Sequence, residues 1–318
     1  MNLIGNTPMI KIIYFDQGVK KHIYTKLEYY NITGSIKDRM VEYVLREAKR
    51  KGELKEHMPI IEATSGNTGI SLAALGTYYK HPVIIFMPDW CSKERVELMK
   101  SFGAEVHLIS KEEGGFKRCI KEADKLALTL HGYRMNQFSN NDNKMAHYQS
   151  TALEIIQSVP EVSSFTSGIG TGGTLMGIGM KLKEYNHNIK VIALEPSKMA
   201  LLSGSKTLEQ HKIEGIGDDF IPDLVEKEII DDVYQIDDED AINMSRLLAR
   251  KLGLGVGISS GANFLSAILA NRNYDGACVT VFPDDNKKYL STELVDDVCN
   301  NQAFLSNQIE LLDYEILL

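Results

Sequence analysis

The sequence has few of the residues that mark disulfide-bonded or metal-binding proteins. Only four of its 318 residues are cysteine, and Cys91, Cys119, Cys278 and Cys299 lie far apart with no C-x-x-C pair. Disulfide frameworks and structural zinc sites depend on closely spaced cysteines, so we expect neither a disulfide network nor a metal site. A reducing cytoplasm is the simplest setting for such thiols, and we expect a cytoplasmic location.

Long apolar runs and basic tails are also lacking. No stretch approaches the roughly 20 apolar residues that a membrane helix needs. The first residues, MNLIGNTPMIKI, do not combine a charged segment with an apolar one, as a secretory signal does. No segment is rich enough in Lys and Arg to suggest nucleic-acid binding. We therefore expect neither a membrane nor a nucleic acid as partner.

Acidic residues are concentrated in one segment. The formal net charge is −8, but residues 214–240 alone hold 12 Asp and Glu against a single Lys. The remaining residues carry 31 acidic and 34 basic side chains. The protein is thus not acidic as a whole, and this segment needs an explanation of its own.

Short apolar runs alternate with amphipathic segments along most of the chain. This pattern predicts an α/β fold with parallel sheets that are covered on both faces. Expected strands cover 58–62, 81–88, 104–109, 162–167, 190–195, 231–236 and 278–282, and expected helices cover 67–79, 92–102, 114–130 and segments starting near 173 and 289. Ligands of such sheets bind at the carboxyl ends of strands, beside helix N-termini, so the turns there are the places to search.

The first such turn is NITGSIKDR at residues 31–39. Ser35 can cap the helix that follows, and Asp38 falls in its first turn, where the helix dipole favours an acid. Lys37 faces the positive end of that dipole, which lowers its pKa as a Schiff-base lysine requires. An ordinary surface lysine is the alternative.

The second turn is EATSGNTGI at residues 62–70. The backbone N–H groups of Ser65 to Thr68, with the hydroxyls of Thr64 and Thr68, can form a nest for a carboxylate. A simple capped turn needs one such residue, whereas this turn has five in a row.

The third and fourth turns are SGIGTGGTLMG at 167–177 and GVGISSGAN at 255–263. The third contains G-x-G-x-x-G, and Glu195 ends the next expected strand, as in a dinucleotide site. Its dense TGGT at 171–174 is better suited to a single phosphate. Ser259 and Ser260 in the fourth turn are either helix caps or ligands of a polar ring atom.

Together these residues resemble the cysteine synthase/cystathionine β-synthase family of fold-type II pyridoxal-phosphate enzymes, from GNTP at 5–8 to KYLST at 288–292. The resemblance implies pyridoxal 5′-phosphate as cofactor, a small amino acid as substrate, and a homodimer. It also implies a tryptophan synthase β-like fold with two open, twisted, mostly parallel sheets. The larger, cofactor-binding domain would comprise residues 1–34 and 146–318, and the smaller, mobile domain residues 35–145.

The resemblance also assigns roles to individual residues. Lys37 would hold the cofactor as a Schiff base and move the substrate's α-proton, Asn67 would bond the 3′-oxygen, and Ser259 would meet the pyridine nitrogen. The phosphate would be held by Gly170, Thr171, Gly172, Gly173 and Thr174, the substrate carboxylate by Thr64, Ser65, Gly66, Thr68 and Gln137, and the loop after Gly215 would border the β-carbon.

The implied reaction is β-replacement or β-elimination on cysteine or an O-activated serine, through an aminoacrylate. Where family members often read G-I-G-A-G-F, this sequence has Asp218 and Asp219, and the next strand opens with Asp231 and Asp232. A carboxylate facing the β-carbon would repel hydrosulfide and activate water or a thiol, favouring release of sulfide from cysteine. Asp232 is the preferred candidate, because strand alternation places it on the same face as Tyr234. Solvated surface acids are the alternative.

Other functions stay open at this stage. An ordinary O-acetylserine sulfhydrylase that makes cysteine, or a serine/threonine dehydratase, would use the same fold and cofactor. An NAD-dependent oxidoreductase would explain the glycine-rich turn but neither Lys37 nor the turn at 64–69. A non-catalytic binding partner has no use for Lys37.

Overall fold

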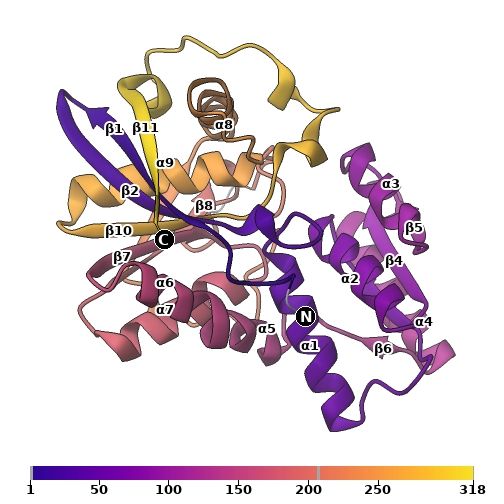
Figure 1. Ribbon diagram of the computed structural model, residues 1–318. Helices are drawn as coiled ribbons and strands as arrows, with labels where there is room; N and C mark the ends of the chain where they lie inside the picture. Colours follow the sequence, from indigo (N-terminus) through magenta and orange to yellow (C-terminus); the bar gives the residue numbers. More distant parts are fainter. Residues whose placement is uncertain (1–2, 206–207, 318) are drawn as a thin grey trace.

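The computed structural model describes residues 3–205 and 208–317 and contains two sheets (Figure 1). The larger sheet has seven strands in the order β11-β1-β2-β10-β7-β8-β9. Its strands β2, β10, β7, β8 and β9 run parallel, whereas β1 is antiparallel to both β2 and β11. The bounds are β1 Met9–Asp16, β2 Val19–Leu27, β7 Val162–Gly168, β8 Lys190–Pro196, β9 Asp232–Ile236, β10 Ala277–Phe282 and β11 Ile309–Leu317.

Helices cover both faces of the larger sheet. Alternate residues of β8 point to opposite sides, so Val191 and Ala193 join one buried cluster and Ile192 and Leu194 join the other. Helices α6 (Ala152–Ser158) and α7 (Gly173–Tyr185) supply the first cluster, and α8 (Asp238–Leu252) and α9 (Ile258–Asn273) the second. Both faces are therefore shielded from solvent, as is usual for a parallel sheet.

The smaller sheet has four parallel strands in the order β5-β4-β3-β6. Helices α1, α2 and α3 pack on one face and α4 on the other. The helix α5 lies against α1 and α7, so it joins the two halves of the molecule. The bounds are β3 Ile60–Ala63, β4 Val83–Pro88, β5 Glu105–Ile109, β6 Tyr133–Arg134, α1 Lys37–Lys51, α2 Asn67–Tyr78, α3 Lys93–Ser101, α4 Gly115–Leu130 and α5 Asn141–Ala146.

These sheets confirm the predicted α/β class with two mostly parallel sheets. The helix expected from about residue 289 is wrong, because only short 3-10 turns, Asn286–Tyr289 and Glu293–Val295, form there. The carbonyl of Lys288 accepts a hydrogen bond from the Ser92 hydroxyl at 2.6 Å, which ties this segment to the smaller sheet's side of the molecule. The limits and the mobility of the two domains stay predictions.

Within the described part of the chain, no helix has the length and apolar character needed to cross a membrane.

Candidate active site

The four turns singled out in the sequence meet between the two sheets, where strands of both sheets end. Two adjoining cavities lie there, and Lys37 and Asn67 line both. The first is also lined by Gly170, Thr171, Gly172, Thr174, Gly215 and Ser259. The second is also lined by Thr64, Ser65, Gly66, Thr68, Gln137, Gly170, Thr171, Gly215 and Asp218.

Lys37 is the first residue of α1, as its turn predicted. Enclosure by the surrounding protein lowers the pKa of its amine, while the nearby carboxylates of Asp284 and Asp218 oppose that shift. The preceding segment is fixed by Asp38, which accepts hydrogen bonds from the Thr33 N–H at 2.7 Å and the Ser71 hydroxyl at 2.6 Å. A lowered pKa favours the neutral form of the amine, which is the form that a Schiff-base lysine needs.

The turn after β3 is shaped to receive an anion. The Thr64 hydroxyl accepts a hydrogen bond from the Gly66 N–H at 3.1 Å, and α2 begins at Asn67. The Thr68 hydroxyl donates to Gln137 at 2.7 Å, and the Gln137 amide donates to the Ala63 carbonyl at 2.8 Å. These bonds hold the turn so that its remaining N–H groups and the helix N-terminus face the cavity.

The glycine-rich turn forms a cradle at the N-terminus of α7. A Cβ on Gly170 would lie 2.3 Å from the Gly215 carbonyl, and one on Gly173 would lie 1.9 Å from the Asn143 side chain. Gly172 has a φ of +85°, which side-chain-bearing residues rarely adopt. Gly173 begins α7 beneath this cradle and is not among the residues lining the two cavities. The turn therefore suits a phosphate approached by backbone N–H groups.

His147 supports this cradle, a role that no pattern in the sequence indicated. Its ring contacts the Thr174 hydroxyl at 3.3 Å and the Thr151 hydroxyl at 3.0 Å. Burial and the nearby charge of Arg39 lower the pKa of His147 to about 3, so the ring is neutral. A lone histidine in the sequence carries no signal for such a role, because its partner Thr174 comes from a distant segment.

These features fit pyridoxal phosphate. The site offers a lysine with a lowered pKa, a cradle at a helix N-terminus, and a hydroxyl at Ser259. The Asn67 Oδ1 atom is buried without a hydrogen-bond partner within the described part of the structure, as expected for an atom beside a ligand site. A dinucleotide-binding site would not explain why Lys37 and the turn after β3 line the same cavity.

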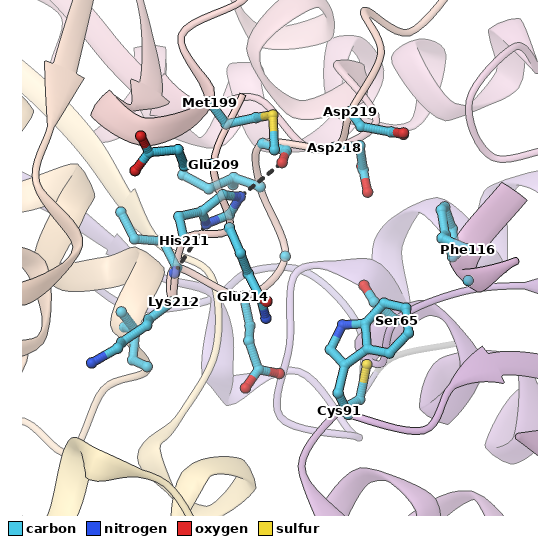
Figure 2. A pocket seen from close by; sticks show the side chains of 18 of the residues that line it. Ser65, Cys91, Phe116, Met199, Glu209, His211, Lys212, Glu214, Asp218 and Asp219 are labelled. Carbon is cyan, nitrogen blue, oxygen red and sulfur yellow. Dashed lines mark hydrogen bonds between the residues drawn. The ribbon is translucent and has the colours of Figure 1, made fainter. Parts of the chain in front are cut away.

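Asp218 is the predicted acid that lies in the cavity with Lys37. Burial, with the negative charge of Asp219, raises the pKa of Asp218 to about 6, and Lys37 opposes the shift. Figure 2 shows the Asp218 side chain pointing into the space toward Phe116 and Ser65, while Asp219 points aside. Asp219 instead pairs with Lys117 of α4 at 2.7 Å.

An aromatic cluster holds the loop that carries Asp218. Phe220 packs edge-on against Phe138 with ring centroids 5.0 Å apart, and Phe138 packs against Phe116 of α4 at 5.8 Å. Phe138 directly follows Gln137, which bonds Thr68 and the Ala63 carbonyl. The aromatic cluster therefore links the Asp218 loop to the turn after β3, residues 64–68, which is named the anion-binding turn for its proposed role.

Asp232, the acid preferred from the sequence, does not line either cavity. Asp232 opens β9 opposite Ile192 of the parallel strand β8, so it lies at the amino end of the sheet, whereas the cavities lie at the carboxyl end. Its carboxylate accepts hydrogen bonds from the Val233 N–H at 2.9 Å and the Tyr274 hydroxyl at 3.4 Å. Asp231 is likewise structural, because it accepts from the Val191 N–H at 2.8 Å and pairs with Lys183 at 2.5 Å.

A wider chamber of about 930 Å³ leads toward these cavities between the two halves of the molecule (Figure 2). Asp218, Asp219, Ser65 and Phe116 lie on its wall, and His211 closes one side by bonding the Gly217 carbonyl at 2.8 Å. The chamber therefore reaches Ser65 of the turn after β3 along a wall that includes Asp218.

Comparison with known proteins agrees with this geometry. Residues 1–284 match the family described as "Pyridoxal-phosphate dependent enzyme". The chain is 40% identical to cysteine synthase B of Campylobacter jejuni over 295 residues, which is 92% of this chain and 96% of that protein.

Solved structures are also similar. A hydrogen sulfide-producing enzyme from Fusobacterium nucleatum shares 48% identity and a TM-score of 0.95, covering 99% of this chain and 97% of that one. A cysteine synthase from Entamoeba histolytica shares 36% identity and a TM-score of 0.88, covering 96% and 93%. One of these structures is thus described as a hydrogen sulfide-producing enzyme and the other as a cysteine synthase.

Proposed function

Because this chain belongs to the family of pyridoxal-phosphate-dependent enzymes and resembles its cysteine synthases, we propose that it consumes cysteine and releases hydrogen sulfide. The observation that carries the proposal is the place of Asp218, whose carboxylate shares the cavity with Lys37 and the anion-binding turn. Similarity to the sulfide-producing enzyme of Fusobacterium nucleatum supports it.

The role proposed for each residue is the one that the family resemblance implies, and the position of the residue at the cavities supports it. The turn from Thr64 to Thr68, with Gln137, binds and orients the substrate's carboxylate. Lys37, whose pKa is lowered, takes the proton from the α-carbon as a neutral amine. The glycine-rich turn holds the cofactor phosphate, with Asn67 and Ser259 at its ring. When bound, pyridoxal phosphate acts as an electron sink, which lets the α-proton and the β-substituent leave.

Asp218 then decides which nucleophile adds. At neutral pH its carboxylate is mostly ionised, so it repels hydrosulfide by on the order of 1–3 kcal/mol and accepts a proton from water. In the overall change the Cβ–S bond of cysteine breaks, a Cβ–O bond to water forms, and cysteine plus water becomes serine plus hydrogen sulfide. A neutral thiol in place of water would give a thioether.

The competing function is cysteine synthesis from O-acetylserine and sulfide, which the likeness to cysteine synthase B favours. Incubating the holoenzyme with cysteine alone, and separately with O-acetylserine and sulfide, distinguishes the two. We expect sulfide and serine from cysteine at a higher kcat/KM than that of cysteine formation. Cysteine formation as the faster reaction would refute the proposal.

The homodimer is part of the same proposal, and sedimentation at equilibrium tests it.

A further inference from the structure

Asp284 is a buried carboxylate beside the site to which neither the sequence nor the proposed chemistry assigns a role. It follows β10 and is 1% exposed. Its backbone forms an isolated bridge with Ser35, and its carbonyl accepts a hydrogen bond from the Gly257 N–H at 3.0 Å. Asp284 is therefore fixed between the segments that carry Lys37 and Ser259.

The carboxylate reaches the amide of Asn67. Asp284 Oδ2 accepts a hydrogen bond from Asn67 Nδ2 at 2.8 Å and another from the Tyr289 hydroxyl at 2.7 Å. Asn67 begins α2, which packs on the smaller sheet, whereas Asp284 and Tyr289 follow β10 of the larger sheet. This contact thus spans the boundary at the cavity.

An ionised carboxylate can only accept hydrogen bonds, so it dictates which way the Asn67 amide faces. The Nδ2 atom must point toward Asp284. That leaves its second hydrogen, and the unpartnered Oδ1, for a group in the cavity. A serine or an amide at position 284 could donate or accept and would allow either orientation of the amide.

A positively charged side chain lies beside this carboxylate. The Arg95 guanidinium lies 4.0 Å from Asp284 Oδ2 and stacks over the Tyr289 ring at 4.4 Å. Arg95 also pairs with Glu214, next to Gly215. Space for the other carboxylate oxygen exists because residue 257 is glycine: a Cβ there would lie 2.1 Å from Asp284 Oδ1.

We propose that Asp284 is a positioning residue that fixes the amide of Asn67 toward the cofactor ring. The inference rests on the proposed role of Asn67 and is independent of which β-substituent the enzyme releases. Its test therefore needs no substrate: the readouts are the dissociation constant of pyridoxal phosphate and the visible absorbance maximum of the bound cofactor.

A double-mutant cycle with Asn67→Ala and Asp284→Asn tests it. We expect each single variant to weaken cofactor binding by about tenfold and to shift the absorbance maximum. The double variant should lie closer to Asn67→Ala than the sum of the two single effects, because most of the effect of Asp284 passes through that amide and only the remainder through its charge beside Lys37. Tyr289→Phe is the matched control, since it removes the other donor to the same oxygen and should keep both readouts.

Three outcomes overturn the proposal. The first is that Asp284→Asn binds the cofactor and absorbs as the unmodified protein does. The second is that Asp284→Asn has the same effect on cofactor affinity in the Asn67→Ala background as it has alone. The third is unchanged readouts in Asn67→Ala itself, which would also remove the proposed role of Asn67. If Asp284→Asn does not fold, Gly257→Ala replaces it, because the added Cβ displaces the Asp284 carboxylate without removing its charge. Unchanged cofactor affinity and absorbance in Gly257→Ala would refute the proposal equally.

Discussion

At the scale of single residues, Asp218 is the side chain whose ionisation should govern the reaction. If it acts as a base with a pKa of about 6, kcat/KM for sulfide release from cysteine should rise through that pH and level off above it. Asp218→Asn should lower kcat/KM by about 100-fold or more and remove this limb of the profile. Stopped assays of sulfide from pH 5 to about 8 measure both effects.

Asp232→Asn is the matched control for that experiment, because it makes the same chemical change at the amino end of β9. Its pH profile and rate should equal those of the unmodified protein. If the acidic limb survives in Asp218→Asn, Asp218 is not the titrating base.

The position of Asp232 shows what the sequence alone could not provide. Alternation correctly placed Asp232 and Tyr234 on one face, and both contact residues near the end of α9. Strand period does not say which end of the sheet a residue occupies. The anion-binding turn and the glycine-rich turn were predictable, because each is a local motif following a strand.

At the scale of secondary-structure elements, glycines let α7 approach its neighbours. A Cβ on Gly177 would lie 2.2 Å from the Lys144 carbonyl, whereas one on Gly179 would meet only side-chain atoms, at 2.9 Å and beyond. Gly177→Ala should therefore lower the free energy of unfolding by about 1–3 kcal/mol. Gly179→Ala should cost less, because the side chains of Val191 and Ile229 can shift. Urea unfolding of both variants measures the difference, and equal losses would contradict the argument.

Three of the strands that the sequence did not predict, β1, β2 and β11, lie at the edge of the larger sheet where pairing involves distant partners. Strands β1 and β2 pair with each other and β1 with β11, which lies some three hundred residues away. Strands β2 and β11 contain many exposed residues, so they lack the continuous apolar runs that identified the buried parallel strands. The segment around residue 289 forms short turns, because the Lys288 carbonyl accepts a hydrogen bond from the Ser92 hydroxyl and the Tyr289 carbonyl accepts one from the Thr292 N–H three residues on.

At the scale of the whole molecule, a buried ionic cluster joins the N-terminal segment to α1 and α6. Arg39 bonds Glu28 through Nε at 2.6 Å and Glu154 at 2.7 Å, and Lys26 lies 2.8 Å from Glu154. The Asn6 N–H donates to Glu154 at 2.9 Å. This cluster holds together segments that come from both predicted domains.

The cluster should make stability depend on pH. Burial alone would raise the pKa of Glu154, but bonds from Arg39 and the charge of Lys26 lower it to about 2. A carboxyl whose folded pKa is depressed stabilises the protein above its unfolded pKa, about 4.3, and loses that contribution as pH falls toward 2. Glu154→Gln should therefore cost on the order of 3 kcal/mol at pH 7, and the difference from the unmodified protein should shrink below about pH 4.

Glu315→Gln provides the control, because Glu315 pairs with Lys11 at 3.1 Å on the surface, where its side chain is 57% exposed. Loss of such a pair costs about 0–1 kcal/mol. Urea unfolding at pH 7 and at several lower pH values gives the free energies for both variants. A Glu154→Gln deficit that stays constant as the pH falls would mean that the lost stability comes from packing and not from the carboxylate's charge, because only the charge disappears on protonation.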